Sequence, residues 1–242
     1  MYILTAWVSE SSVCVAQKKV DDKSNEITAI PELLDNMNIK EAVVSIDAIG
    51  CQKLIASKII NKEGDYLLAL KKNQKDSYQR VEDVFRFHAP KKFDLMKDKN
   101  HAREETRKCS ILDINKLPKD EIPSKWNGLN TLVKIESTRK TKDKTQQNTR
   151  YYLSSEIIKN PSYYNMLVRG HWSIENKLHW HLDVTFKEDA SRSRKGNAPE
   201  NLNILRKIAL QRVNLQKDKL SKKKRRFKAA MNTNYIKEIL RI

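Results

Sequence analysis

One acidic residue and two histidines are spaced so that they could share one side of a helix. Glu175 lies four residues after His171 and four residues before His179, a spacing that brings helical side chains together. Apolar side chains recur at the helical period and predict a buried stripe next to Glu175: Leu167, Ile174, Leu178 and Leu182. A carboxylate at the border of such a stripe would point into a partly desolvated cleft, where it could bind a metal ion or act as an acid or base.

The same three side chains also have simpler interpretations. Glu175 could be solvated or paired with a Lys or Arg, and the two histidines could bond to backbone carbonyls. A zinc site formed by His171, Glu175 and His179 is a further alternative. However, the sequence has no nearby cysteine pair and no HExxH motif, so zinc is disfavoured.

A second carboxylate, Asp47, follows the short and almost wholly apolar run 42–46. That run predicts a central strand covered on both faces. A second buried strand is predicted at 66–70, and it ends at Lys71 and Lys72. Helices are predicted at 51–61 and 76–88, and this alternation indicates an α/β sheet with parallel members.

Ligands of open α/β sheets bind at the carboxyl ends of the strands, which is where the sequence places Asp47. A helix cap or a turn is the alternative role for this residue. Lys71 and Lys72 could meet a phosphate backbone there, or they could simply be solvated. If the helix carrying Glu175 packs beside this edge, the two carboxylates could hold Mg²⁺, which prefers oxygen ligands. Paired Mg²⁺ ions roughly 3.5–4 Å apart promote attack on a phosphodiester by water or a 3′-hydroxyl.

The rest of the chain suggests four regions. Strands at 2–8 and 13–20 predict a hairpin, and 24–36 predicts a helix. Residues 90–103 show no clear pattern, and strands at 105–114, 130–139 and 149–155 with long polar loops predict an antiparallel β insertion. Asn160 and Pro161 begin a helix, and Pro199 begins another. We therefore divide the chain into the first part of an α/β core at 1–89, the insertion at 90–157, a core helix at 158–190 and a basic helical region at 191–242.

The charge balance favours a polyanionic partner. The chain has a net charge of +18 and a pI of about 9.7. Residues 191–242 contain 16 Lys and Arg against 3 Asp and Glu, which is +13 of that total. Nucleic acid is the commonest partner of such a protein. The run 222–226 predicts a solvated or DNA-facing surface. Three widely spaced cysteines fit a reducing cytoplasm. No membrane span or signal peptide is indicated.

Several of these segments occur together in a known family. Residues 46–52, 64–74, 169–176 and 182–189, supported by 23–34 and 194–202, resemble bacterial insertion-sequence transposases of the H-repeat-associated, IS4-like type. The resemblance implies an RNase H-like fold, in which a mixed sheet is flanked by helices and a β insertion precedes a glutamate. It also implies a DDE triad of two aspartates and one glutamate. Asp47 resembles the second aspartate, and Glu175 resembles the glutamate.

The resemblance also suggests roles around this pair. Asp47 and Glu175 would be catalytic ligands of Mg²⁺ or Mn²⁺. The supporting residues would be His171, Asn176 and His179. The DNA contacts would be Lys71, Lys72, Arg192, Arg194 and Lys195. The implied partners are insertion-sequence ends, target DNA and further copies of the chain in a homo-oligomer. No membrane is implied, and the expected location is the cytoplasm, at the bacterial nucleoid.

One motif of the family has no counterpart here. The first aspartate of the triad belongs to an Asp-Gly-Lys motif, and no Asp-Gly-Lys occurs in the sequence. We therefore expect a chain truncated at its N-terminus, with impaired or absent phosphoryl transfer, because catalysis depends on positioning both metal ions. A non-catalytic DNA-binding remnant, or an inhibitor of an intact transposase, is the alternative function. A chain that does not fold stably without a first strand is a third possibility.

Overall fold

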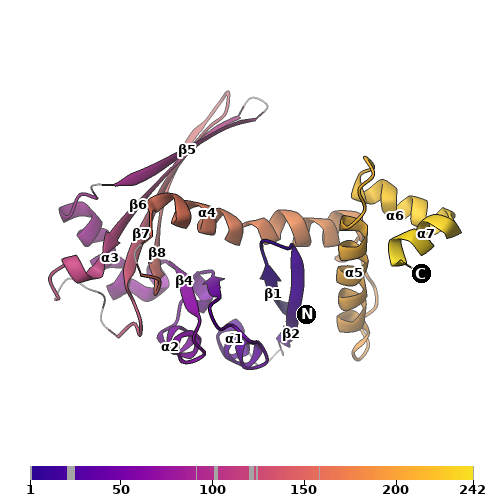
Figure 1. Cartoon of the computed structure of the whole chain (residues 1–242), viewed down its shortest axis with the longest axis horizontal. Helices are drawn as coiled ribbons and strands as arrows, with labels where there is room; N and C mark the ends of the chain where they lie inside the picture. Colours follow the sequence, from indigo (N-terminus) through magenta and orange to yellow (C-terminus); the bar gives the residue numbers. More distant parts are fainter. Residues whose placement is uncertain are drawn as a thin grey trace. The chain divides into compact units, whose positions relative to one another are not determined.

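The computed structural model describes residues 2–20, 25–90, 92–100, 103–119, 123, 125–157 and 159–241. Its helices and strands are labelled in Figure 1. The chain divides into two compact units. One comprises Val20–His171, and the other comprises Met1–Lys19 together with Trp172–Ile242. The division into four regions made from the sequence remains a prediction.

The unit Val20–His171 contains a six-stranded mixed sheet. Only its first two strands in the spatial order are parallel, and every other pair is antiparallel. The order across the sheet is β3 (Val43–Ile46), β4 (Asp65–Leu70), β8 (Thr145–Ser154), β7 (Thr131–Lys140), β6 (Arg103–Asp113) and β5 (Phe93–Asn100). The predicted mixed α/β architecture is confirmed, and it is consistent with an RNase H-like fold.

The prediction that 42–46 is a central buried strand was wrong. β3 lies at one end of the six-stranded order, and all four of its residues are half-buried. Within the described part of the chain only β4 pairs with it. An apolar run therefore reports a strand near the core, but it does not report how many neighbours the strand has. The register pairs Ile46 with Leu68, so the residues that follow β3 and β4 emerge at the same edge of the sheet.

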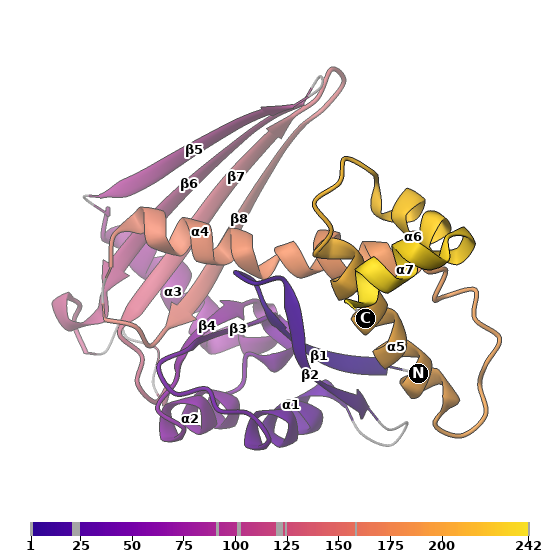
Figure 2. The ribbon, with the colours of Figure 1, turned by 45° about the vertical axis from the view of Figure 1, so that its right-hand side comes forward.

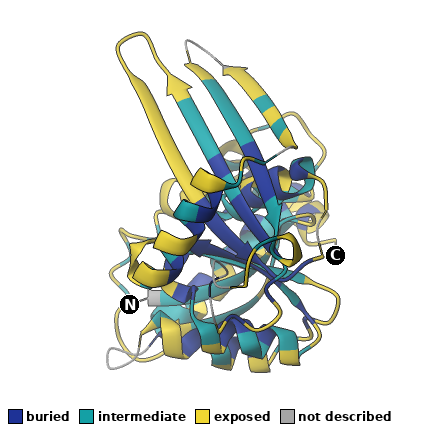
Figure 3. Cartoon of the chain, turned by 90° about the vertical axis from the view of Figure 1, so that its left-hand side faces the viewer, coloured by how far each residue is buried: buried dark blue, intermediate teal, exposed yellow. Residues whose placement is uncertain are grey.

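Helices cover both faces of this sheet. α1 (Glu26–Asp35) and α2 (Lys53–Asn61) contact one another, α3 (Lys75–Phe87) stacks Phe85 on Tyr151 of β8, and α4 is Pro161–His171. On α4, the Tyr164 hydroxyl donates to Thr131 of β7, which pairs with Ser154. Tyr151 and Ser154 are three residues apart and so face opposite sides of a strand. α3 and α4 therefore pack on opposite faces, and the inner parts of the strands are buried (Figure 3).

The outer halves of the insertion strands differ from the prediction. Residues 93–100, within a segment without a clear pattern, form β5, and β8 begins at Thr145 inside a segment expected to be loop. The register of β7 and β8 extends to Lys140 and Thr145. Residues 145–150 are exposed, whereas 151–154 are buried (Figure 3). Where both faces of a strand meet water, no alternation of apolar and polar residues marks it in the sequence.

The second unit begins with the predicted hairpin, β1 (Tyr2–Val8) and β2 (Val13–Val20). Its helical part starts with the π-helical turns η4 (Glu175–His179) and η5 (His181–Thr185). It continues with α5 (Ala198–Asn214), α6 (Lys222–Met231) and α7 (Thr233–Leu240), of which α6 and α7 lie side by side (Figure 2). The apolar cluster of this unit consists of Leu178, Leu182 and Leu210, with Trp7, Ile174 and Phe186 packed against it.

A buried lysine joins the hairpin to α5 in this unit. Lys207 is only 7% exposed, and its Nζ donates to Thr5 Oγ1 and Gln17 Oε1, both at 2.8 Å. Burial lowers the pKa of Lys207. One basic residue of the C-terminal region is therefore committed to packing. No helix in the described residues is long and apolar enough to cross a membrane.

Candidate functional site

Asp47 stands directly after β3 and begins the short 3-10 turn η1 (Ala48–Gly50). Its carboxylate does not cap this turn, so the helix-cap alternative is not realised. Oδ1 is buried and accepts no hydrogen bond, although Nζ of Lys71 lies 3.4 Å from it as an ion pair. The side chain as a whole is 43% exposed. One carboxylate oxygen thus faces inward, with a lysine as its neighbour, at the carboxyl edge of two parallel strands.

Two side-chain amides hold the loop that carries Asp47. Asn73 Nδ2 donates to Ala48 O at 2.7 Å, and Gln74 Nε2 donates to Cys51 O at 3.0 Å. Both amides belong to the 3-10 turn η2 (Lys72–Gln74), which follows β4. Sequence reasoning did not assign them a role. The available signal was their position, since two amides immediately after a strand that neighbours β3 are well placed to reach the next loop.

A hydrogen bond links β3 to the end of α4. Ser45 Oγ lies 3.1 Å from His171 Nδ1, and both side chains are partly buried. Ser45 precedes Asp47 by two residues, and His171 precedes Glu175 by four. The structure thus gives His171 a positioning contact on the strand that carries Asp47. Sequence reasoning proposed His171 as a supporting residue, but it missed Ser45.

Cys51 also borders this loop, and it is unsuited to nucleophilic chemistry. Its side chain has no exposed surface. Burial, with a further contribution from the negative charge of Asp47, raises the pKa of the thiol to about 12. The thiolate, which is the reactive form, is therefore scarce at neutral pH.

Glu175 belongs to the other unit, where it begins the π-helical turn η4. Its side chain is exposed, so the expectation of a partly desolvated cleft was wrong within the structure of this chain alone. Asn176 is exposed too, and His179 is half-buried. The helical backbone here closes i to i+5, as in the bond from Trp180 N to Glu175 O. This widened turn changes the side-by-side alignment that four-residue spacing gives in an α-helix.

Further carboxylates lie near Glu175. The pKa of Asp183 is raised, first by partial desolvation and then by the charges of Asp189, Glu188 and Glu175, while His179 opposes the rise. The Asp183 side chain itself is exposed. Sequence reasoning missed this concentration of negative charge.

One of these carboxylates already has strong partners. Glu188 Oε1 accepts from Asn203 Nδ2 at 3.0 Å and pairs with Arg206 Nη1 at 3.1 Å. It is therefore a structural anchor between the loop after η5 and α5. Among the described residues, no group of three His, Cys, Asp or Glu is arranged to hold a metal ion.

The residues proposed to contact DNA are all on the surface. Lys71 and Lys72 are exposed after β4, and Arg192, Arg194 and Lys195 are exposed in the coil before α5. Lys71 is also the ion-pair partner of Asp47. Lys72 belongs to the 3-10 turn η2, and the other four lie outside the helices and strands.

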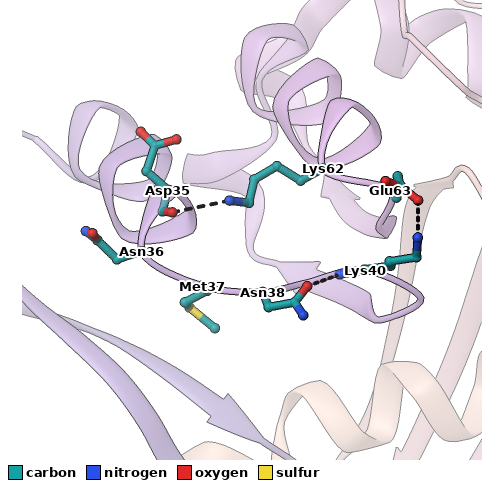
Figure 4. A pocket seen from close by; sticks show the side chains of 7 residues that line it. All are labelled: Asp35, Asn36, Met37, Asn38, Lys40, Lys62 and Glu63. Atoms are coloured by element: carbon teal, nitrogen blue, oxygen red, sulfur yellow. Dashed lines mark hydrogen bonds and ion pairs between the residues drawn. The ribbon is translucent and has the colours of Figure 1, made fainter.

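A separate hollow of about 460 Å³ lies between the ends of α1 and α2 (Figure 4). It is lined by Asp35, Asn36, Met37, Asn38, Lys40, Lys62 and Glu63. Its charged groups already have partners: Lys40 pairs with Glu63 at 2.6 Å, Lys62 Nζ donates to the backbone carbonyl of Asp35 at 3.2 Å, and the Asp35 carboxylate pairs with Lys58 at 2.6 Å. No residue proposed from the sequence lines it.

Comparison with known proteins agrees with this fold. A family model described as "Transposase DDE domain" matches residues 2–212, and the chain belongs to this family. It is 39% identical to a protein of Escherichia coli O157:H7 named "Putative transposase YncI", over 99% of this chain and 63% of that protein. It is 37% identical to the "H repeat-associated putative transposase YhhI" of Escherichia coli K12, over 99% of this chain and 65% of that protein. The chain thus spans a little under two thirds of the length of these relatives.

Proposed function

We propose that the chain is the core of a DDE-class DNA transposase that cleaves and joins insertion-sequence ends with Mg²⁺ or Mn²⁺. One observation carries the proposal. In a chain of the transposase DDE domain family, a carboxylate oxygen of Asp47 is buried at the carboxyl edge of parallel strands, where it accepts no hydrogen bond and has only the ion pair with Lys71. A buried carboxylate oxygen that accepts no hydrogen bond is costly unless a further charged partner satisfies it.

This oxygen suits a divalent cation, because Mg²⁺ and Mn²⁺ favour carboxylate ligands. Asp47 and Glu175 would hold the ion. When bound, such an ion promotes attack by a hydroxyl group and stabilises the leaving oxygen of a phosphodiester. Because Glu175 is exposed, its carboxylate is accessible to a metal ion and to DNA.

The other residues of the site would position or neutralise charge. Asn73 and Gln74 fix the loop after Asp47 through backbone carbonyls, and the Ser45–His171 hydrogen bond fixes the strand before it. Lys71, beside Asp47, would meet a DNA phosphate next to the metal ion.

Further contacts would lie on the surface. Asn176 and His179 would lie beside the reacting DNA. Lys72, Arg192, Arg194 and Lys195, which are all exposed, would bind the backbone without reading sequence. DNA cleavage and joining would take place in the cytoplasm, at the bacterial nucleoid, with several copies of the chain assembled on the DNA.

We also propose that residues 1–242 alone transfer strands weakly or not at all. The resemblance implies a third acidic ligand in an Asp-Gly-Lys motif, and these residues contain no such motif. A ligand shared by two metal ions affects the position of both, so its absence should cost more than one weakened contact.

A second candidate is DNA binding without catalysis, through which the chain would occupy element ends or inhibit an intact relative. The net charge of +18 favours it. Charge of this kind supports binding that weakens steeply with added salt.

Titration of the chain with Mn²⁺ in an isothermal titration calorimeter tests the first candidate. We expect Asp47→Asn and Glu175→Gln each to weaken Mn²⁺ binding at least tenfold. A matched control, Asp35→Asn, should have no effect because Asp35 pairs with Lys58 on the surface. Unchanged Mn²⁺ affinity in Asp47→Asn would refute the site. Plasmid binding and nicking, measured beside the Mn²⁺ titration, separate the candidates. A chain that binds plasmid and also binds Mn²⁺ through Asp47 is a transposase core, whether its nicking is weak or absent. A chain that binds plasmid but not Mn²⁺ is a binding module.

A further inference from the structure

The basic run 222–228 folds as helix α6, and an arginine pins one face of it. Arg225 is only 8% exposed, and its Nε donates to Asp218 Oδ1 at 2.6 Å. Its Nη1 donates to Val213 O, at the end of α5, at 2.9 Å. Asp218 in turn accepts from the Tyr235 hydroxyl of α7 at 2.6 Å. This network ties α6 to both of its neighbours and fixes its rotation about its own axis.

A second arginine of the run is also used internally. Arg226 donates to the backbone carbonyl of Thr185, and its guanidinium lies 5.4 Å from the centre of the Phe186 ring. The two arginines therefore stabilise the unit. They are not simply part of a uniformly solvated charge run.

The opposite face of α6 carries basic and large apolar side chains. At 100° per residue, its members fall within an arc of about 100°. We call this the α6 outer face, and it consists of Lys223, Lys224, Phe227 and Met231. All four are exposed, with Phe227 at 67% and Met231 at 74%. Lys228, next to this face, instead places its Nζ 4.0 Å from the centre of the Tyr235 ring of α7. No acidic residue occurs in α6.

We propose that the α6 outer face is a binding surface for double-stranded DNA, an inference that rests on the proposed function. Lys223 and Lys224 would contact phosphates. Phe227 and Met231, which lie between lysines, would pack against sugars or enter the minor groove, as apolar side chains of DNA-binding proteins do. The fixed rotation of α6 presents these groups together, so little ordering is needed on binding.

The composition of this face favours DNA over a membrane surface. A helix that lies on a lipid surface needs a broad apolar face to insert below the headgroups. Here only Phe227 and Met231 are apolar, and Lys223 and Lys224 lie on either side of them. Such interleaving suits a charged backbone with grooves better than a hydrocarbon layer.

The double variant Lys223→Gln/Lys224→Gln tests the proposal in the full chain. Each lysine–phosphate contact adds about 0.9 to the slope of log affinity against log salt. Binding of a 30-base-pair duplex, measured in EDTA from 50 to 300 mM NaCl, should lose about 2 from this slope. Phe227→Ala should weaken binding severalfold with the slope unchanged, because it removes no charge.

The matched control is Lys217→Gln/Lys219→Gln, which removes the same charge from exposed lysines outside the helix. Its slope should stay near that of the unaltered chain. Equal losses in the two double variants would show a diffuse charge effect and overturn the proposal. A second outcome would also overturn it: the Lys223→Gln/Lys224→Gln variant binds DNA as the unaltered chain does but loses binding to vesicles of phosphatidylglycerol and phosphatidylcholine. Because EDTA removes metal ions, failure here leaves the metal site to be judged by Mn²⁺ titration.

Discussion

His171 Nδ1 and Ser45 Oγ lie 3.1 Å apart, although 126 positions separate the two residues in the chain. The contact joins the last residue of α4 to the strand that ends at Asp47. It holds the strand through a side chain, in addition to the backbone ladder that joins the strand to β4. The strand that presents the candidate metal ligand is therefore held by both backbone and side-chain bonds.

Removing this bond should lower the stability of the chain. We expect Ser45→Ala to reduce the free energy of unfolding by about 0.5–1.5 kcal/mol, the usual net value of one hydrogen bond. Urea denaturation measures it. Ser45→Thr, which keeps the hydroxyl in a strand, should be closer to the unaltered chain. An alanine variant as stable as the original would show that the bond contributes nothing.

Lys71 should compete with a metal ion for Asp47. Two charges about 4 Å apart in a water-like medium interact by about 1 kcal/mol, which is about fivefold in affinity. Lys71→Met should therefore raise Mn²⁺ affinity severalfold at low salt while weakening DNA binding. Lys72→Met serves as the control, because no ion pair between Lys72 and Asp47 is present in the described structure. A fall in Mn²⁺ affinity in Lys71→Met would contradict this relationship.

Gly50 should be intolerant of a larger side chain. A Cβ at this position would lie 2.4 Å from Ile46 Cγ2 and 2.6 Å from Ile30 Cδ1. Gly50→Ala should destabilise the chain by about 1–3 kcal/mol, as overpacking does, and should also weaken Mn²⁺ binding by displacing the loop after Asp47. Adding Ile30→Val should restore part of the stability. Full stability of Gly50→Ala would mean that the loop moves without cost.

Acid should loosen the packing of α6 and α7 in a defined range. The hydrogen bond from Tyr235, followed by that from Arg225, lowers the pKa of Asp218 from 3.8 to about 2. A carboxylate with a lowered pKa adds stability that is fully present above the unfolded value of 3.8. That stability is lost as the pH falls through about 2.

Thermal unfolding of the unaltered chain and of Asp218→Asn, compared from pH 5 to pH 2, tests this effect. The difference between them should shrink as the pH falls. A constant difference would show that the charge of Asp218 does not matter.

Local pattern predicted much of the fold. β1, β2 and α3 were found within one or two residues, and the start of α4 was predicted at Pro161, because apolar periodicity and caps mark them. Asn160, for example, accepts from Tyr163 N as a cap should. β5 and the outer half of β8 were missed, because exposed strands have no such pattern.

The candidate site was predicted only in part. The place of Asp47 followed from the strand before it. Its partners did not, because the Ser45–His171 bond and the bond from Asn73 to Ala48 join residues distant in sequence. The exposure of Glu175 was mispredicted, although Leu178 and Leu182 of the predicted stripe are buried, because a stripe shows which residues are covered and not what lies beside its border.

The π-helical turns have a consequence for the length of this segment. A turn closed from i to i+5, as in the bond from Phe186 N to His181 O, contains one residue more than an α-helical turn. Residues 175–185 thus hold surplus chain. A single deletion there could be absorbed by return to ordinary α-helical turns, whereas the same deletion in α5 would rotate every later side chain by about 100°. A chain shortened by one residue in this segment would therefore keep the same helix ends, while the side chain of Glu175 would point at a different angle.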